Sequence, residues 1–246
     1  MKIGVKTFDD PKFLKHFEKQ VDFFEIMAIQ KNNYSFLKNF SLPMVIHAEH
    51  QSYGTNITDS TKREHNLKSI NFARKIADSV NAKKIIVHAG VLEKGNKNCS
   101  IKNAVNLIKE IDDDRILLEN LPRDEIFLIV GTSVGFNPQT MKSLLKSTKV
   151  GFCFDVNHAL WMRKKMKINY SFIKDYIKLN PSHYHIGGQR LETKNIHHSL
   201  EDSDINLKEI LKYYPKNAHI TLETIPEIKK TDKDLEIIRN VLEELD

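Results

Sequence analysis

Eight short apolar segments recur along the chain, and their number and spacing limit the folds that it can adopt. They begin about 20 to 40 residues apart, which leaves room for a helix between consecutive strands. Continuous runs of Ile, Val, Leu and Phe are typical of parallel strands whose two faces are both covered. The segments are 2–8, 23–29, 44–48, 84–90, 115–120, 150–156, 183–188 and 218–224. We therefore expect eight parallel strands separated by helices.

Helical patterns lie between these segments. Apolar residues at every third or fourth position predict helices within 62–80 and within 101–111. The stretch 30–43 leaves room for only a short helix between the second and third strands. Helical patterns thus alternate with the predicted strands, and 30–43 is the weakest interval.

Two short motifs predict where helices start. Asn137 followed by Pro138 is typical of a helix start, because asparagine caps the first turn and proline fits it. Thr231 with Asp234 resembles a capping box, with Asp in place of the usual Glu. We expect one helix to begin at each motif.

Eight β–α alternations in one chain predict a closed (β/α)₈ barrel, the TIM barrel, as a single domain over residues 1–246. An open, doubly wound sheet is the alternative. No GxGxxG or GxxxxGK motif follows any of the predicted strands, and such motifs bind nucleotides in many open sheets. No linker, repeat or low-complexity stretch divides the chain.

Composition limits the partners and the cellular location that we expect. The net charge of +6 permits a nucleic acid as partner, although lysine-rich surfaces are common. No apolar run is long enough to span a membrane, and Met1 leads directly into a strand, so we expect neither a membrane segment nor a signal peptide. The two cysteines, Cys99 and Cys153, are far apart and form no metal-binding pair. A reducing cytoplasm is the expected location.

Six of the eight predicted strands carry His, Asp or Glu at their carboxyl ends. In a TIM barrel these ends meet at one rim, where the chemistry of such enzymes takes place. A lone histidine in such a position usually has a structural role, which we expect for His16, His65, His183 and His219. The residues expected at the rim are His47, His88, Glu119, Asp155, His158, His185 and Glu223.

These four imidazoles and three carboxylates need a shared positive charge, because the set contains no Lys or Arg. A divalent metal supplies it, since neutral histidine and ionised carboxylate are ligands of zinc and manganese. One glutamate near the barrel axis can bridge two ions about 3.5–4 Å apart. The loop 194–205 follows the seventh strand, and its adjacent His197 and His198 offer a further ligand.

Four segments resemble the endonuclease IV family, within the larger superfamily of xylose isomerase-like barrels. GFCFDVNHA at 151–159 is similar to the family segment GVCxDTxHA and is the most specific match. VHAG at 87–90 resembles an H-P-G segment, and the stretch 119–135 resembles an E-N segment followed by a Gly-rich stretch. LET at 222–224 fits the final glutamate of the family. The resemblance extends over nearly the whole chain.

The resemblance implies a TIM barrel that holds two or three zinc ions and hydrolyses DNA on the 5′ side of abasic sites. Glu119 would bridge two ions, and Glu119 and Glu223 would be catalytic. The implied ligands are His47, His88 and Glu119 for one ion, Asp155, His185 and Glu223 for a second, and His158 and His197 for a third. DNA contacts are expected from Tyr53, Arg123 and Arg190, although Tyr53 fits an ordinary loop aromatic slightly better.

One position departs from the family pattern. The family has D-x-H after the seventh strand, and this chain has Asn195-Ile196-His197. A neutral amide replaces an anionic ligand, so we expect a weaker third metal site.

The alternative function is a sugar isomerase or epimerase of the same superfamily. One Mn²⁺ or Mg²⁺ ion would polarise a sugar or sugar phosphate, and two glutamates would move protons. That reading needs Glu119, Asp155, His185 and Glu223 but no further ligands, so the additional histidines favour the nuclease. Glu25 points to the isomerase, because acidic residues at the end of the second strand are frequent in sugar-acting relatives, but a structural salt bridge explains Glu25 equally well. A non-catalytic nucleic-acid-binding barrel is disfavoured by the near-complete ligand set.

Overall fold

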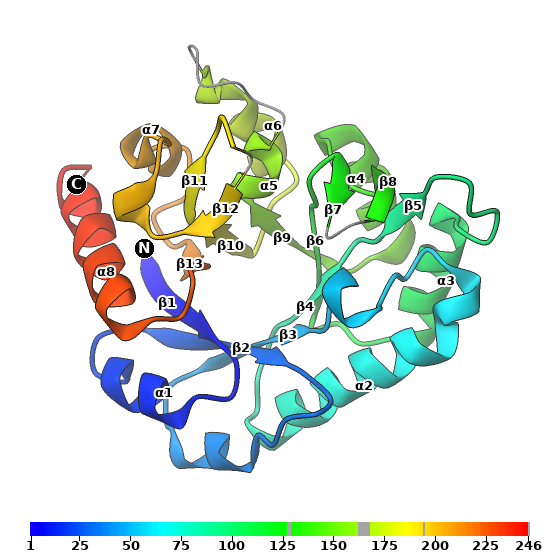
Figure 1. Cartoon of the computed structure of the whole chain (residues 1–246), viewed down its shortest axis with the longest axis horizontal. Coiled ribbons are helices and arrows are strands. Elements are labelled where there is room, and N and C mark those ends of the chain that lie inside the picture. Colours follow the sequence, from blue (N-terminus) through cyan, green and yellow to red (C-terminus); the bar gives the residue numbers. More distant parts are fainter. Residues whose placement is uncertain (127–128, 162–167, 194, 246) are drawn as a thin grey trace.

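Eight parallel strands form one closed barrel in the computed structural model, which describes residues 1–126, 129–161, 168–193 and 195–245 (Figure 1). Going around the barrel, the strands follow the order of the chain, and β1 closes the ring by pairing with both β2 and β13. The barrel strands are β1 (Lys2–Thr7), β2 (Phe23–Ala28), β3 (Met44–Ala48), β4 (Ile85–His88), β6 (Ile116–Glu119), β9 (Gly151–Asp155), β10 (His183–Ile186) and β13 (His219–Leu222). Each lies within one of the predicted segments, which confirms the (β/α)₈ TIM barrel.

Eight α-helices surround the barrel in the described part of the chain (Figure 1). They are α1 (Pro11–Phe17), α2 (Arg63–Ser79), α3 (Ile101–Ile111), α4 (Pro138–Thr148), α5 (Val156–Leu160), α6 (Ile173–Ile177), α7 (Leu207–Leu211) and α8 (Ile228–Glu243). The two helices predicted from periodicity are therefore confirmed as α2 and α3. The short helix expected within 30–43 is a 3₁₀-helix, η1 (Ser35–Asn39). Four more 3₁₀-helices lie in loops: η2 (Gln51–Tyr53), η3 (Ser60–Lys62), η4 (Tyr170–Phe172) and η5 (Leu200–Asp202).

The two predicted helix starts have different outcomes. Asn137 caps α4, and its side chain accepts a hydrogen bond from the amide of Thr140 at 2.9 Å, as expected. The capping box at Thr231 is wrong, because α8 already begins at Ile228 and Thr231 lies inside the helix. Asp234 instead makes a contact between elements, since its Oδ1 accepts from Ser199 Oγ at 2.6 Å.

Two small antiparallel sheets lie in the loops that follow barrel strands. One is formed by β5 (Val91–Glu93), β7 (Asp124–Ile126) and β8 (Ile129–Ser133), and the other by β11 (Gly188–Arg190) and β12 (Asn195–His198) (Figure 1). Gly131 of β8 permits the close pairing with β5, because a Cβ atom there would lie 2.4 Å from the carbonyl oxygen of Leu92. These sheets were not predicted, since strands this short have no clear periodicity.

The interior of the barrel is filled in two levels. The lower level is an apolar cluster of Phe23, Val45, Ile86, Leu117 and Cys153. Side chains of a strand alternate between its two faces, so the residue two positions further along points into the same interior. Those residues are Glu25, His47, His88, Glu119 and Asp155. The apolar cluster therefore forms a floor, and the ionisable side chains lie directly above it.

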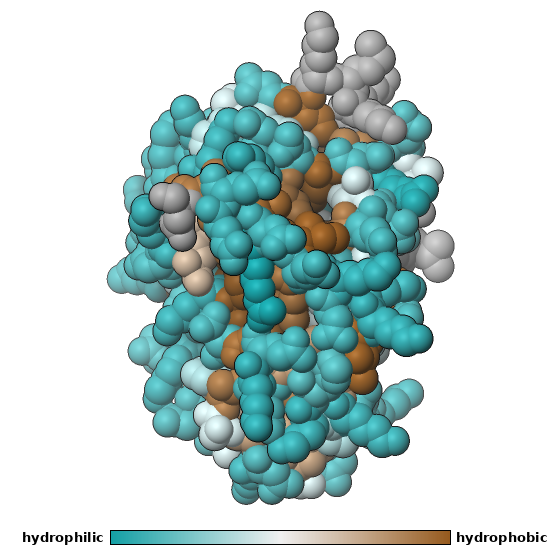
Figure 2. Space-filling model, turned by 90° about the vertical axis from the view of Figure 1, so that its left-hand side faces the viewer, coloured by the Kyte–Doolittle hydropathy of each residue, from teal (hydrophilic) through white to brown (hydrophobic). Residues whose placement is uncertain are grey.

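A second and larger apolar cluster packs between the barrel and the helices. Figure 2 shows that the side of the molecule on which α1 and α8 lie is mostly hydrophilic, with hydrophobic residues visible in a band between hydrophilic ones. Within the described residues, no helix combines the length and apolar character needed to cross a bilayer.

Candidate metal centre

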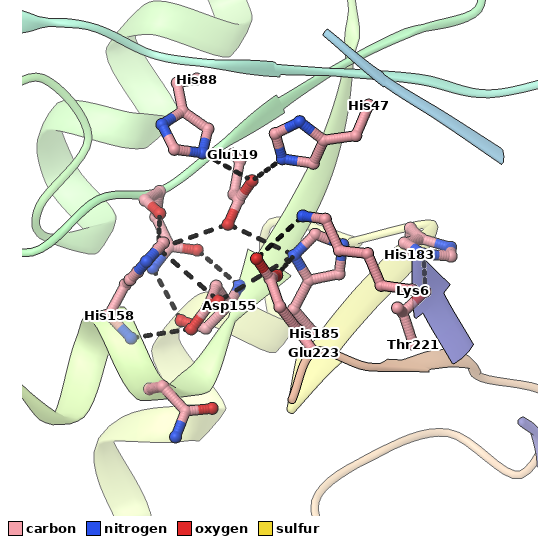
Figure 3. Close-up of polar contacts among 12 residues, drawn as sticks. Lys6, His47, His88, Glu119, Asp155, His158, His183, His185, Thr221 and Glu223 are labelled. Atoms are coloured by element: carbon pink, nitrogen blue, oxygen red, sulfur yellow. Dashed lines mark hydrogen bonds and ion pairs between the residues drawn. The ribbon is translucent and has the colours of Figure 1, made fainter. Parts of the chain in front are cut away.

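The seven ionisable side chains predicted for the rim converge inside the carboxyl end of the barrel (Figure 3). Five of them come from β3, β4, β6, β9 and β10, whereas His158 lies in α5 and Glu223 directly follows β13. His158 is carried inward because Asp155 caps α5, and Asp155 Oδ1 accepts from the His158 amide at 2.7 Å. The spacing Asp-x-x-His thus places both side chains in one site.

Glu119 lies at the centre of this group. Its Oε2 is 3.1 Å from His47 Nε2 and 3.3 Å from His88 Nε2. Its Oε1 is 3.3 Å from the Nδ1 atoms of both His158 and His185. Burial alone raises the pKa of Glu119, but His185 and His88 outweigh that effect and hold the pKa well below its usual range. Glu119 is therefore an ionised carboxylate whose two oxygens face two different pairs of imidazoles.

All eight predicted ligands occur in three sets whose nitrogen and oxygen atoms lie within 4.8 Å of one another. The sets are His47–His88–Glu119, Glu119–Asp155–His185–Glu223 and Asp155–His158–His197. Glu119 belongs to the first two sets and Asp155 to the last two. His197, rather than its neighbour His198, takes part in them within the described part of the chain. The side chain of Asn195 lies outside the described residues.

Each of the five histidines has one ring nitrogen within hydrogen-bond distance of an oxygen other than the carboxylate oxygens of the three sets. The partners are the backbone oxygens of Ala48 for His47 (2.7 Å), Asn120 for His158 (2.8 Å) and Glu223 for His197 (3.1 Å), and the side-chain oxygens of Gln51 for His88 (2.7 Å) and Glu25 for His185 (2.9 Å). In His47, His88, His185 and His197 these acceptors favour a proton on the bonded nitrogen and leave the other nitrogen for a metal. In His158 the bonded nitrogen, Nδ1, is also the one that lies 3.3 Å from Glu119 Oε1. The arrangement fits a bound divalent ion.

The charge states of these histidines differ. Burial lowers the pKa of His88 to about 4, so its ring is neutral at pH 7 and ready to bind a metal. Burial also disfavours charge on His158, but Asp155 and Glu119 outweigh it and raise the pKa of His158 to about 9. A metal ion at His158 must therefore displace a proton, which makes its binding dependent on pH.

Asp155 gives a further indication of a cation. Burial raises the pKa of its carboxyl group, and no donor among the described residues forms a hydrogen bond with Oδ2. A buried carboxylate oxygen without a partner is costly. Since this atom faces the histidines of two ligand sets, a divalent ion fits the missing interaction.

Lys6 was missed, and the expectation that the site contains no lysine or arginine is wrong. Its Nζ lies 2.8 Å from Glu223 Oε1 and 3.2 Å from Glu25 Oε1 (Figure 3). Part of the positive charge at this end of the barrel thus comes from the protein itself. The available signal was a lysine within the apolar run 2–8, because a strand interior accepts such a residue only when it is paired.

Glu25 lies below the centre and contacts one of its members, His185, together with Thr221 and His183. Its Oε2 is 2.8 Å from Thr221 Oγ1, 2.9 Å from His185 Nε2 and 3.2 Å from His183 Nε2. His183 also hydrogen-bonds Thr221 at 2.8 Å. Glu25 thus supports His185 from beneath.

A cavity of about 320 Å³ opens above the centre. Its lining residues are Lys6, Phe8, Met27, His50, His88, His158, His197, Glu223, Thr224, Ile225 and Pro226. His50 is a further residue that sequence reasoning missed, and its ring stacks on His88 with centroids 5.2 Å apart. Burial lowers the pKa of His50 well below its usual value, so it is neutral at pH 7. The cavity lining therefore combines apolar and neutral groups with members of the centre.

The three residues expected to contact DNA lie outside this cavity. Tyr53 in η2 packs against His50, with ring centroids 5.0 Å apart. Arg190 in β11 pairs with Asp202 at 3.3 Å. Arg123 lines a second cavity of about 380 Å³, which shares His158 with the first. Arg123 is thus the one of the three that borders the centre.

A family model described as the xylose isomerase-like TIM barrel matches residues 12–241. The chain belongs to this family. The match confirms the superfamily that the motifs indicated, whose members include endonucleases, isomerases and epimerases and bind divalent metals. No curated protein matches the chain.

Several solved structures of this superfamily are similar to the barrel described here. A D-tagatose 3-epimerase-like protein has a TM-score of 0.76 and 22% identity, covering 99% of this chain and 97% of that chain. Endonuclease IV from Thermus thermophilus has a TM-score of 0.73 and 16% identity, covering 99% and 100%. AP endonuclease, family 2 from Brucella melitensis has a TM-score of 0.71 and 14% identity, covering 98% and 99%. At these identities the likeness extends to the fold and leaves the reaction open.

Proposed function

We propose that the protein is a metal-dependent phosphodiesterase of the endonuclease IV type, which hydrolyses DNA on the 5′ side of abasic sites. The observation that carries the proposal is the position of Glu119, whose two oxygens face two separate pairs of histidines. Such a carboxylate suits a site with more than one metal ion. A sugar isomerase with a single ion has no need for His47 and His88, which lie 3.1 and 3.3 Å from Glu119 Oε2.

Zinc ions held by these ligands would polarise the phosphate and lower the pKa of a bound water, so that hydroxide is available at neutral pH. The chain itself contributes the placement of the groups. Glu119 joins two ligand sets, and Glu223 belongs to one set and also lines the cavity. We therefore assign to Glu223 the role of taking a proton from a water molecule at the cavity wall.

The net charge of +6 supports a polyanionic substrate. Each phosphate contact contributes roughly −0.9 to the slope of log K against log salt for duplex DNA. We expect binding to an abasic duplex to weaken steeply with salt and to depend little on base sequence. A flat salt response would count against DNA as the substrate.

The decisive experiment combines cleavage with metal analysis. Protein reconstituted with zinc is expected to hold at least two ions per chain and to cut an abasic duplex 5′ of the site, leaving a 3′-hydroxyl. Two variants are compared, His47→Gln in the centre and His65→Gln on the outer part of α2. The comparison separates loss of a metal ligand from the general effect of losing a histidine. Cleavage lost only in His47→Gln supports the proposal, whereas failure of the two-zinc protein to cut abasic DNA refutes it.

The second candidate is a sugar isomerase or epimerase with one Mn²⁺ or Mg²⁺ ion. Two observations favour it: the cavity of about 320 Å³ suits a monosaccharide, and Glu25 lies buried beneath His185. This reaction would need only the set Glu119–Asp155–His185–Glu223. His47→Gln should then leave interconversion of a ketose unchanged, which is the opposite of the result expected for the nuclease.

A further inference from the structure

Lys6 is a buried cation beside the metal centre, and the proposed function gives it no role so far. It projects from β1 into the barrel, and only 11% of its side chain is exposed. Burial disfavours its charge, but Glu223, Glu25 and Glu119 outweigh that effect and raise its pKa above the usual value. The side chain is therefore an ammonium ion at pH 7.

The position of the ammonium is set by two carboxylates. Glu223 Oε1 lies 2.8 Å and Glu25 Oε1 lies 3.2 Å from its Nζ. The other oxygen of Glu223, Oε2, is 2.6 Å from His185 Nδ1 and so faces a metal-ligand set. Lys6 is thus in direct contact with one member of that set, Glu223 (Figure 3).

Lys6 also reaches the substrate side of the centre. It lines the cavity of about 320 Å³, and among the described residues of that lining it is the one lysine or arginine. An ammonium has three N–H donors. Among the described residues Glu223 Oε1 accepts a hydrogen bond from it at 2.8 Å, and Glu25 Oε1 forms an ion pair with it at 3.2 Å. One donor therefore remains for a group that enters the cavity.

Charge compensation alone explains Lys6 less well. A buried ion pair often stabilises a protein no more than apolar side chains of similar volume. Conversely, an ammonium at the wall of a cavity that also borders a metal centre is well placed for an oxyanion, since lysine binds phosphate as a point charge. Phe8, Met27 and Ile225 line the same cavity and provide apolar contact for a sugar ring.

We propose that Lys6 binds a non-bridging oxygen of a sugar-linked phosphate, at the same time as that phosphate meets the metal centre. The inference rests on the proposed function in one respect, namely that the phosphate is part of a phosphodiester. The same contact would serve a free sugar phosphate, and the experiment separates the two sources.

The test measures binding rather than turnover. Calorimetric titration of inorganic phosphate into zinc-loaded protein compares the wild type with Lys6→Gln, Lys6→Arg and, as a control, Lys2→Gln at the exposed start of the same strand. Because hydrogen bonds to charged groups contribute about 1.5–3 kcal/mol, Lys6→Gln should weaken phosphate binding by roughly 10- to 100-fold. Lys6→Arg should keep most of the affinity, and Lys2→Gln should match the wild type. Zinc content should be equal in all four proteins.

Three results would overturn the proposal. The first is an unchanged phosphate affinity of Lys6→Gln. The second is loss of zinc from Lys6→Gln, which would show that Lys6 supports the metal ligands. The third is failure of both Lys6→Gln and Lys6→Met to fold, which would show that Lys6 is needed for the core. Titration with a short abasic duplex and with deoxyribose 5-phosphate then identifies the source of the phosphate. If Lys6→Gln weakens phosphate binding but the protein cuts no abasic DNA, the inference stands and the proposed function fails. If abasic DNA is cut and Lys6→Gln binds phosphate normally, the proposed function stands and the inference about Lys6 fails.

Discussion

Glu25 Oε2 lies 2.9 Å from His185 Nε2, and both side chains are fully buried. This contact favours a proton on Nε2 and turns Nδ1 toward Glu119 and Glu223. The tautomer of a central ligand is thus set by a residue outside the three ligand sets.

Glu25→Gln should weaken zinc binding, because an amide accepts a weaker hydrogen bond than a carboxylate does and no longer balances the charge of Lys6. Loss of such a supporting contact typically costs about 10- to 100-fold in metal affinity. Competition with a chelator of known affinity measures the change, and Glu64→Gln on the exposed face of α2 is the matched control. Equal zinc affinity of all three proteins would show that His185 needs no support from Glu25.

Glu119→Gln should have a larger effect than any other single ligand substitution. Only a carboxylate offers two equivalent anionic oxygens, and both oxygens of Glu119 face imidazoles. We expect fewer zinc ions per chain together with loss of DNA cleavage. Elemental analysis and an abasic-site assay check this, and a variant with full activity and full zinc content would rule out the bridging role.

Asn195→Asp should strengthen the third metal site, formed with Asp155, His158 and His197. An amide oxygen can bind zinc but adds no negative charge to offset a third dication. The variant should therefore hold more zinc at limiting concentration and cut abasic DNA faster than the wild type. Should the wild-type protein already hold three tightly bound ions and cut equally fast, another group of the loop 194–205 completes the site.

Asp113 should control acid stability independently of the metal centre. Arg115 and Arg74 hydrogen-bond its carboxylate at 2.7–2.9 Å in the turn before β6 and hold its pKa below the ordinary value of 3.8. The unfolded chain thus binds the proton more readily, so the stabilisation is complete above about pH 4 and is lost as the pH falls below it.

Asp113→Asn should therefore destabilise the metal-free protein by about 1.5–3 kcal/mol at pH 7, and the difference from the wild type should shrink below pH 4. Urea unfolding between pH 2 and pH 7, in the presence of chelator, measures it. A difference between the two proteins that stays constant across this pH range would contradict the assignment.

Much of the fold was predictable because most barrel strands combine apolar residues with a polar residue near the carboxyl end. Val45 and His47, or Leu117 and Glu119, are two positions apart and point into the same interior. The same alternation that builds the apolar floor of the barrel therefore allows the ligands to be predicted from the sequence. The small sheets of β5, β7, β8, β11 and β12 were missed because their pairing depends on loop contacts.

The electrostatics of the site were harder to predict. Lys6 and Glu25 carry opposite charges on neighbouring strands, and only the register that pairs Lys6 with Glu25 shows that they meet. His50 likewise lies in a loop, where no periodicity indicates its stacking on His88. Thr231 resembled a helix start because its local sequence fits a cap, but Asp234 bonds to Ser199 instead.

The closure of the ring by β1 and β13 determines when the site can first exist. Lys6 and Glu223 are 217 positions apart and belong to the first strand and to the end of the last. During synthesis, a chain that still lacks β13 has unpaired edges on β1 and β10, and its Lys6 lacks the contact with Glu223. Capture of metal by the full ligand set therefore requires that the chain has been synthesised and folded at least as far as Glu223, at the end of β13.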